Sequence, residues 1–181
     1  MDELKPVTRW KEMLPLVSSG CEIRAIQPNS ITAVMPFSGQ AEAVSVALKG
    51  TVGLGFPQPN RAQFSNDVKI IWMGSDQAFV LGAAIREMPN AAVVDQSDGW
   101  AVFQLKGPAS EDVLARLVPV DLRQGVFDVG HTARTALFHV PCSITRTATD
   151  SFDIMVYRSM AETAIGELAD AISSVAARNG V

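Results

Sequence analysis

The sequence has no long uninterrupted stretch of apolar residues. Its longest candidate, FVLGAAI (79–85), has the length of a strand, whereas a membrane-spanning helix needs about 20 apolar residues. The first residues, MDELKPVTRWKEML, lack the basic region and following apolar stretch of a secretory signal. We therefore expect no membrane association and a cytoplasmic location.

Cysteine and histidine are scarce. Cys21 and Cys142 lie far apart in the sequence and form no CxxC spacing, so we expect two unpaired thiols that behave as small hydrophobic residues. His131 and His139 are too few and too isolated to complete a zinc site. The residue pattern thus predicts no metal site in this chain.

Positive charge is also in short supply. The formal net charge is −4 and the sequence pI is near 5.1. A nucleic-acid partner requires a basic face that neutralises phosphates. We expect no nucleic acid as the main partner.

What the sequence does contain is enough apolar material for one good core. Hydrophobic residues make up 48% of the 181 residues and charged residues 19%, which is typical of a folded protein and not of a disordered one. A chain of this length forms one compact unit or two small subdomains that share a core.

Hydrophobic periodicity and turn residues divide the chain into short elements. We expect a helix with Ala41, Val44 and Leu48 on one face, capped by Ser38 and ended by Gly50. A short helix is expected to begin at Pro108, and a long final helix to follow the capping box Ser159–Glu162 and end at Asn179-Gly180. The expected strands are 22–26, 31–37, 68–74, 78–82, 91–95, 100–107, 132–140, 142–148 and 152–158.

The two halves of the chain resemble each other. The strand–helix–hairpin order from residue 31 can be laid beside the order from residue 100, so that Leu48 meets Leu117 and Phe56 meets Phe127. We expect an α+β fold with two similar subdomains, each an antiparallel sheet with helices on one face. The expected bounds are an N-terminal segment at 1–20, a first subdomain at 21–90 and a second at 91–181.

The glycine-rich stretches are better explained as turns than as ligand sites. Gly50, Gly53 and Gly55 follow a helix, whereas a dinucleotide fingerprint precedes one. Gly107 opens a helix alone, and Pro108 removes an N–H that a phosphate would need. We therefore expect Gly107-Pro108 to be a structural turn.

The acidic and imidazole groups offer no fixed catalytic constellation. Asp95 and Asp98 could form a carboxylate pair, but Asp and Ser favour turns through local hydrogen bonds. Asp76 and Asp150 fall in hairpin turns in the same way. His131 could act as a general base, but the sequence fixes no nucleophile or acidic group beside it.

Three arginines and three tryptophans leave alternatives open. Arg134, Arg146 and Arg158 lie on successive expected strands and could line an anion or carboxylate site, or could be solvent-facing residues or partners for Asp and Glu of another chain. Trp72 and Trp100 are expected to be at least half buried. Trp10 lies in a polar segment and could be an exposed anchor for a partner.

From Val94 onward the sequence resembles a known family. The resemblance is carried by VDQSDGWAVFQLKGPASEDVLARLVPVDL (94–122), FDVGHTARTALFHVPCSITRT (127–147) and FDIMVYRSMAETAIGEL (152–168). The stretch WMGSDQAFVL (72–81) is similar to the first half of the same family. These motifs, in this order, resemble the gamma subunit of heterotetrameric sarcosine oxidase.

This resemblance implies a fold related to the folate-binding domain of the glycine-cleavage aminomethyltransferase. It implies alpha, beta and delta subunits as partners, in a complex that oxidatively demethylates sarcosine to glycine. The complex would transfer the one-carbon unit to tetrahydrofolate and form hydrogen peroxide. FAD, FMN, NAD and zinc would reside in the partner subunits, and this chain would carry no catalytic, cofactor-binding or metal-binding residues of its own.

Two other functions remain open at this point. The first is a standalone folate-binding protein or aminomethyltransferase-like enzyme, in which Arg134, Arg146 and Arg158 would bind the glutamate tail of folate. The second is a small independent homodimer. The mean hydropathy of +0.17 favours a chain with obligate partners.

Overall fold

The structure, a computed structural model, describes residues 9–18 and 20–179. In this part of the chain two antiparallel sheets combine with helices, so the expected α+β class is confirmed. The first eight residues of the expected N-terminal segment, and Gly180 at the expected end of the last helix, lie outside the described residues.

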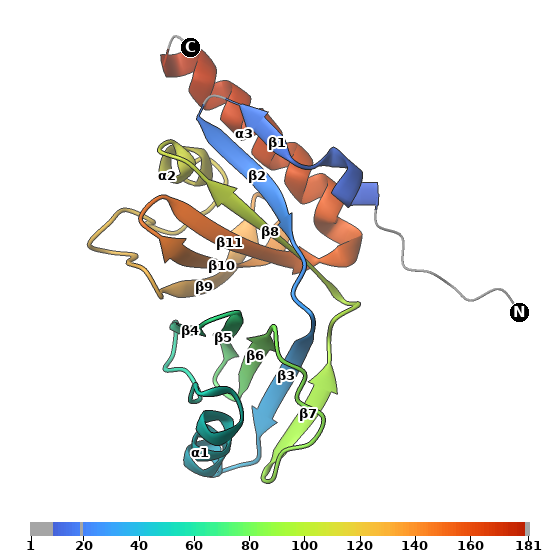
Figure 1. Ribbon diagram of the computed structural model, residues 1–181. Helices are drawn as coiled ribbons and strands as arrows, with labels where there is room; N and C mark the ends of the chain where they lie inside the picture. Colours follow the sequence, from blue (N-terminus) through green and yellow to red (C-terminus); the bar gives the residue numbers. More distant parts are fainter. Residues whose placement is uncertain (1–8, 19, 180–181) are drawn as a thin grey trace, which may run out of the picture.

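One sheet has six strands and the other has five, all antiparallel (Figure 1). The six-stranded sheet has the order β1 (Leu16–Ser18), β2 (Cys21–Ile26), β8 (Trp100–Lys106), β11 (Ser151–Tyr157), β10 (Val140–Ala148) and β9 (Thr132–Leu137). The five-stranded sheet has the order β4 (Ala62–Ser65), β5 (Val68–Gly74), β6 (Gln77–Leu81), β3 (Ile31–Pro36) and β7 (Ala91–Asp95).

Helices cover the outer face of each sheet, so that the molecule has four layers. The helical elements are η1 (Arg9–Met13), α1 (Ala41–Val52), α2 (Ser110–Leu114), η2 (Arg158–Met160) and α3 (Ala161–Asn179). In Figure 1, α3 and α1 lie at opposite ends of the stack, with the two sheets between them.

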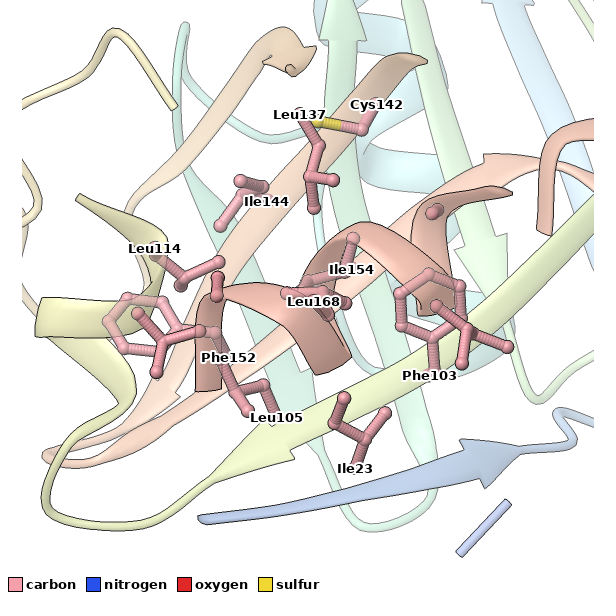
Figure 2. Packing of buried hydrophobic residues seen from close by; sticks show 14 of the residues in the cluster. Ile23, Phe103, Leu105, Leu114, Leu137, Cys142, Ile144, Phe152, Ile154 and Leu168 are labelled. Carbon is pink, nitrogen blue, oxygen red and sulfur yellow. The ribbon is translucent and has the colours of Figure 1, made fainter. Parts of the chain in front are cut away.

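Three hydrophobic clusters fill the spaces between these layers. The first joins the six-stranded sheet to α2, α3 and η1; Figure 2 shows Leu168 of α3 and Leu114 of α2 packed over Phe103 and Phe152 of the sheet. The second lies between the sheets, where Ile31 and Phe79 pack with Trp100. The third joins the five-stranded sheet to α1.

The two sheets are built on the same strand plan. The order β4-β5-β6-β3-β7 in one sheet corresponds to β9-β10-β11-β8-β2 in the other, and a helix follows β3 and β8 alike. Leu48 and Phe56 pack in the outer core of the first half, and Leu117 and Phe127 pack in that of the second. The resemblance between the two halves of the sequence thus reflects a repeated topology.

The leading strand of each half is exchanged. β2 precedes β3 in the chain but pairs with β8, and β7 precedes β8 but pairs with β3. The two sheets therefore do not follow the sequence division at residue 90. The crossover segments lie side by side, where Gln96 N donates to Ile31 O at 2.8 Å and Ile31 N donates to Ser97 Oγ at 3.0 Å (Figure 1).

The helix boundaries differ from the expected ones at their ends. α1 begins after Gln40 instead of Ser38 and continues through Gly50 to Val52. Gly53 ends it in the left-handed conformation, with a φ of 76°. Gly50 was expected as the stop because it is the first glycine after the apolar stripe, but a glycine inside a helix costs only about 1 kcal/mol.

The later helices also begin away from their expected caps. α2 begins at Ser110, so Pro108 precedes the helix instead of occupying its first position. Ser159 lies inside η2 and does not cap α3, which begins at Ala161. The expected apolar face of α3 is confirmed, since Ile165, Leu168 and their neighbours on that face are buried.

Gly107 and Pro108 form a structural turn. Gly107 has a φ of 139°, and a Cβ atom at this position would lie 2.0 Å from Gly20 O. The Gly107 N–H donates to Asp150 O at 2.9 Å. The turn therefore packs directly against the β1–β2 turn, where only a glycine fits.

Candidate functional site

The three arginines of the proposed anion site do not converge on one another. Arg134 lies with its guanidinium 5.9 Å from the centre of the Trp100 ring and donates to Met73 O at 3.4 Å. Arg158 donates from Nε to Asp98 O at 2.7 Å and from Nη2 to Ser97 O at 2.9 Å. The interpretation of these arginines as one folate-tail site is not supported by this arrangement.

Arg146 is buried, with 1% of its surface exposed. Its guanidinium contacts Glu111 Oε1 at 2.7 Å, donates to Leu122 O and Thr149 O, and lies 4.4 Å from the centre of the Phe152 ring. These contacts tie α2 and the following loop to β10. Arg146 therefore holds the second half together, a role that the sequence did not indicate.

The carboxylates between β7 and β8 form a turn. Asp95 Oδ1 accepts hydrogen bonds from Ser97 N at 2.9 Å and from Ser97 Oγ at 2.6 Å. The Ser97 hydroxyl, followed by its backbone N–H, lowers the pKa of Asp95. Because Ser97 Oγ also accepts from Ile31 N at 3.0 Å, this turn ties the β7–β8 crossover to β3, and the turn interpretation is confirmed.

The other candidate groups also serve the fold. The side chain of Ser75 donates to Asp76 within its hairpin turn at 3.1 Å, and Asp150 O accepts from Ser110 Oγ at 3.2 Å. The ring of His131 packs edge-on against Phe127 at 5.7 Å. The glycine-rich segment ends α1, where Phe56 N donates to Ser45 Oγ at 3.0 Å beside Gly55.

Both thiols are free and buried. Burial raises the pKa of Cys142 to about 12. Burial also raises the pKa of Cys21 above its ordinary value. Such thiols are poor nucleophiles at neutral pH, because the thiolate is the reactive form.

The tryptophans are all more buried than exposed. Trp100 is 6% exposed and Trp72 is partly buried, as expected. Trp10 is 4% exposed and belongs to the core beneath α3, so its interpretation as an exposed anchor was wrong. The residues next to Trp10 in the sequence are mostly polar, so the sequence did not indicate that this one side chain of η1 points into the core.

A polar network connects the two sheets. Lys69 of β5 forms an ion pair with Asp153 of β11, which is 1% exposed. Gln104 Nε2 donates to the other oxygen of Asp153 at 3.1 Å, and Arg24 Nε donates to Gln104 Oε1 at 3.0 Å. Both oxygens of Asp153 are therefore engaged, and the network fixes how the sheets face each other.

This network was not predicted from the sequence, although a signal for it was present. Asp153 interrupts the otherwise apolar run FDIMV (152–156), and an acidic residue at such a position is almost never fully buried unless it is paired. Among the described residues, no group of three or more His, Cys, Asp or Glu side chains could hold a metal ion. No helix in the same part of the chain is long and apolar enough to cross a membrane.

Known proteins that resemble this chain identify its family. The model of the sarcosine oxidase gamma subunit family matches residues 38–174. The chain belongs to this family. The sarcosine oxidase gamma subunit of Corynebacterium sp. (strain U-96) is 31% identical over 146 residues, which cover 72% of this chain and 70% of that protein. The gamma subunit of an Arthrobacter species is 27% identical, with the same shares covered.

A solved structure matches nearly the whole fold of this gamma-family chain. A chain of the heterotetrameric sarcosine oxidase from Corynebacterium sp. U-96, in complex with pyrrole 2-carboxylate, superposes with a TM-score of 0.81. The match covers 95% of each chain at 22% sequence identity. It establishes that the four-layer fold with two sheets occurs in that assembly.

Proposed function

We propose that this chain is the non-catalytic gamma subunit of a heterotetrameric sarcosine oxidase and that it supports assembly of the complex. The observation that carries the proposal is the family match over residues 38–174. Two polar groups singled out in the sequence support it as well, because Arg146 and Asp95 are engaged in holding the fold.

The proposed complex contains alpha, beta and delta subunits beside this chain and lies in the cytoplasm. It oxidatively demethylates sarcosine to glycine, transfers the one-carbon unit to tetrahydrofolate and forms hydrogen peroxide. FAD, FMN, NAD and zinc are held by the partner subunits. The fold of the gamma chain is related to the folate-binding domain of the glycine-cleavage aminomethyltransferase.

We propose that the chain acts as a rigid spacer between larger subunits. Phe138, in the β9–β10 turn, is the best candidate for an anchor. It is 54% exposed and has a φ of 53°, a conformation that is a genuine outlier for a bulky residue. Its N–H donates to Leu117 O at 2.7 Å, which holds the ring in its outward position, and aromatic anchors dominate many interfaces.

The test is affinity purification of the tagged full chain from its native host, followed by native mass spectrometry. The proposal predicts recovery of two large flavin-bearing chains and a small zinc-binding chain at equal stoichiometry. Recovery of this chain alone, while the large chains are expressed, would contradict it. Tight binding of tetrahydrofolate to the chain alone in calorimetry would instead support a folate-binding protein.

A matched pair of variants sharpens this test. Phe138→Ser is expected to lower the yield of the complex about tenfold or more, since an anchor at the centre of an interface contributes about 2 kcal/mol or more. Val46→Ser, on the exposed face of α1 at 66% exposure, is expected to leave the yield unchanged. Circular dichroism of each chain verifies that the fold is intact.

A further inference from the structure

The edges of the two sheets are not alike. β4 and β9, one from each sheet, are joined by hydrogen bonds from Ala62 N to Gly130 O at 2.7 Å and from Thr132 N to Asn60 O at 3.1 Å. At the other edge of the six-stranded sheet, β1 pairs with β2. At the other edge of the five-stranded sheet lies β7 (Figure 1), which corresponds to β2 in the repeated plan but has no strand beyond it in the described part of the chain. The place that β1 fills beside β2 is therefore open beside β7.

Two hydrogen bonds, one at each end of β7, fix which of its backbone groups point outward. Asn90 O accepts from Phe37 N at 2.9 Å, and Gln96 N donates to Ile31 O at 2.8 Å. Bonded and non-bonded pairs alternate along an antiparallel ladder, so the even-numbered residues of β7 bond to β3 and the odd-numbered residues direct their N–H and C=O groups outward. Val93 lies at the centre of this outward row, and no hydrogen bond from the rest of the described chain reaches its N–H or C=O.

β7 also lacks the sequence features that protect an edge strand, which are a charged side chain, a proline or a bulge. The run from Ala91 to Val94 holds neither charge nor proline, and its register with β3 is unbroken. Asp95, at the end of the strand, turns Oδ1 to Ser97. An apolar edge with free backbone groups is the kind of surface to which another extended segment adds as a strand.

Apolar side chains flank this open edge on the face that turns toward the other sheet. Ala33 is fully buried between the sheets, whereas Val94, its partner in the ladder, is 42% exposed. Phe37, directly after β3, is 57% exposed. Because paired residues of neighbouring strands lie on the same face, the six-stranded sheet stops short of β7. A strand added beside β7 would cover Val94.

We propose that an extended segment of another subunit adds to β7 as a sixth strand of this sheet. The inference rests on the proposed function, because that function supplies the partner subunits. The segment would exchange backbone hydrogen bonds with Val93, place a β-branched or aromatic side chain beside Val94, and carry a basic residue opposite Asp95, whose Oδ2 accepts no hydrogen bond from a described residue. A second copy of β7, with the sequence AAVVD, has no basic residue to offer, so the chemistry favours a different chain.

Hydrogen exchange within this one strand tests the proposal directly. The full chain alone and the complex assembled with its partner subunits are exchanged in D₂O, quenched, and read residue by residue by mass spectrometry with electron-transfer fragmentation. The Val93 amide, which points outward, is expected to exchange at least about tenfold more slowly in the complex than in the chain alone. The Val94 amide, which bonds to β3, is the internal control and is expected to exchange slowly in both.

Two variants at one position test the same edge through assembly. Val93→Pro removes the outward N–H without removing a bond to β3, and proline is tolerated at such an edge position. It is expected to weaken assembly about tenfold, through the lost hydrogen bond and the obstructing ring. Val93→Thr keeps the N–H and the branched shape and is expected to assemble like the unchanged chain. Circular dichroism verifies that both variants are folded.

The outcomes separate this inference from the function on which it rests. If the unchanged chain recovers no partner subunit, the proposed function fails and this inference fails with it. If the complex forms but Val93 exchanges as quickly as in the chain alone, or if Val93→Pro assembles as well as Val93→Thr, only the added strand is overturned. Slow exchange of Val93 in the chain alone would also overturn it, because the chain would then cover its own edge, through a second copy if the protection grows with concentration.

Discussion

The two halves of the molecule share a strand plan but cover it with different helices. In the first half, the 12 residues of α1 cover the outer face of the five-stranded sheet. In the second half, the helix at the equivalent place, α2, has only 5 residues, and the 19-residue α3 at the end of the chain completes the cover. The sheet topology is thus repeated, while the helical layer is free to change.

The two halves also differ in the interactions that stabilise their outer cores. The second half anchors its short helix and long loop with the buried guanidinium of Arg146. The outer core of the first half is built around Val44 and Leu48 of α1, and none of the described residues that form it carries a buried charge. The second half should therefore be sensitive to loss of one polar side chain, and the first half only to loss of apolar volume.

Arg146→Ala gives the largest expected effect. It removes the ion-pair partner of Glu111, whose side chain is 33% exposed, and leaves the carbonyl oxygens of Leu122 and Thr149 without their donor. A buried hydrogen-bonding group left unsatisfied costs about 1–3 kcal/mol of the free energy of unfolding, and truncating a fully buried side chain adds a loss of packing. Arg123→Ala is the matched control, because Arg123 pairs with Asp121 while its side chain is 79% exposed, and exposed ion pairs contribute little to stability. Urea denaturation measures both; similar losses in the two variants would contradict the structural role of Arg146.

Leu168→Ala and Leu48→Ala test whether the halves unfold together. Each leucine is 0% exposed in its outer core, so each substitution is expected to cost about 2–5 kcal/mol. Because both sheets share the core between them, we expect both variants to shift one common transition in calorimetry. Two separate transitions, each moved by one variant, would show that the halves are independent.

Gly107→Ala is expected to cost more than Gly39→Ala, although both glycines have positive φ. A methyl group at Gly107 meets Gly20 O at 2.0 Å, whereas one at Gly39 meets nothing within 4 Å. Gly39→Ala should cost about 1–2 kcal/mol from backbone strain alone, and Gly107→Ala should exceed it by at least about 1–3 kcal/mol through overpacking. Equal thermal midpoints for the two variants would refute the close packing of the two turns.

The smallest expected effect is the pH dependence of the Asp121–Arg123 pair. The hydrogen bond from the Arg123 side chain lowers the pKa of Asp121 to about 2. Because folding lowers this pKa below its unfolded value of about 3.9, the Asp121 carboxylate contributes fully to stability above about pH 3.9. That contribution is lost as the pH falls toward 2. Carboxyl NMR titration measures this pKa, and Arg123→Ala should return it toward the ordinary value; no difference would contradict the pairing.

Much of the local structure could be predicted from the sequence. Nine of the strands follow from short apolar runs bounded by turn residues, and the apolar face of α3 follows from a period of three to four residues. The short edge strands β1 and β4 were not predicted. The exchange of β2 and β7 could not be predicted, since Gln27-Pro28-Asn29 gives the same turn signal whether the chain turns back or crosses to another sheet. The pairing of strands depends on long-range packing, which local propensities do not determine.

The candidate site was harder to predict for a related reason. Arg134 and Arg146 lie on the neighbouring strands β9 and β10, and Arg158 begins η2 directly after β11 instead of ending that strand. The partners of each arginine depend on the loops that fold over it. The loop that carries Leu122 covers Arg146 and accepts a hydrogen bond from it. The β7–β8 turn accepts a hydrogen bond from Arg158 through Ser97 O. Burial of Trp10 by α3 is equally non-local, and so is the pairing of Asp153 with Lys69 across the sheets.

The most direct test of the account is to produce the proposed partner subunits with and without this chain and to measure the assembled mass and the oxidation of sarcosine. If this chain supports assembly, the four-chain complex forms only when this chain is present, and the chain alone oxidises no sarcosine. A stable, fully active complex that assembles without this chain would contradict it.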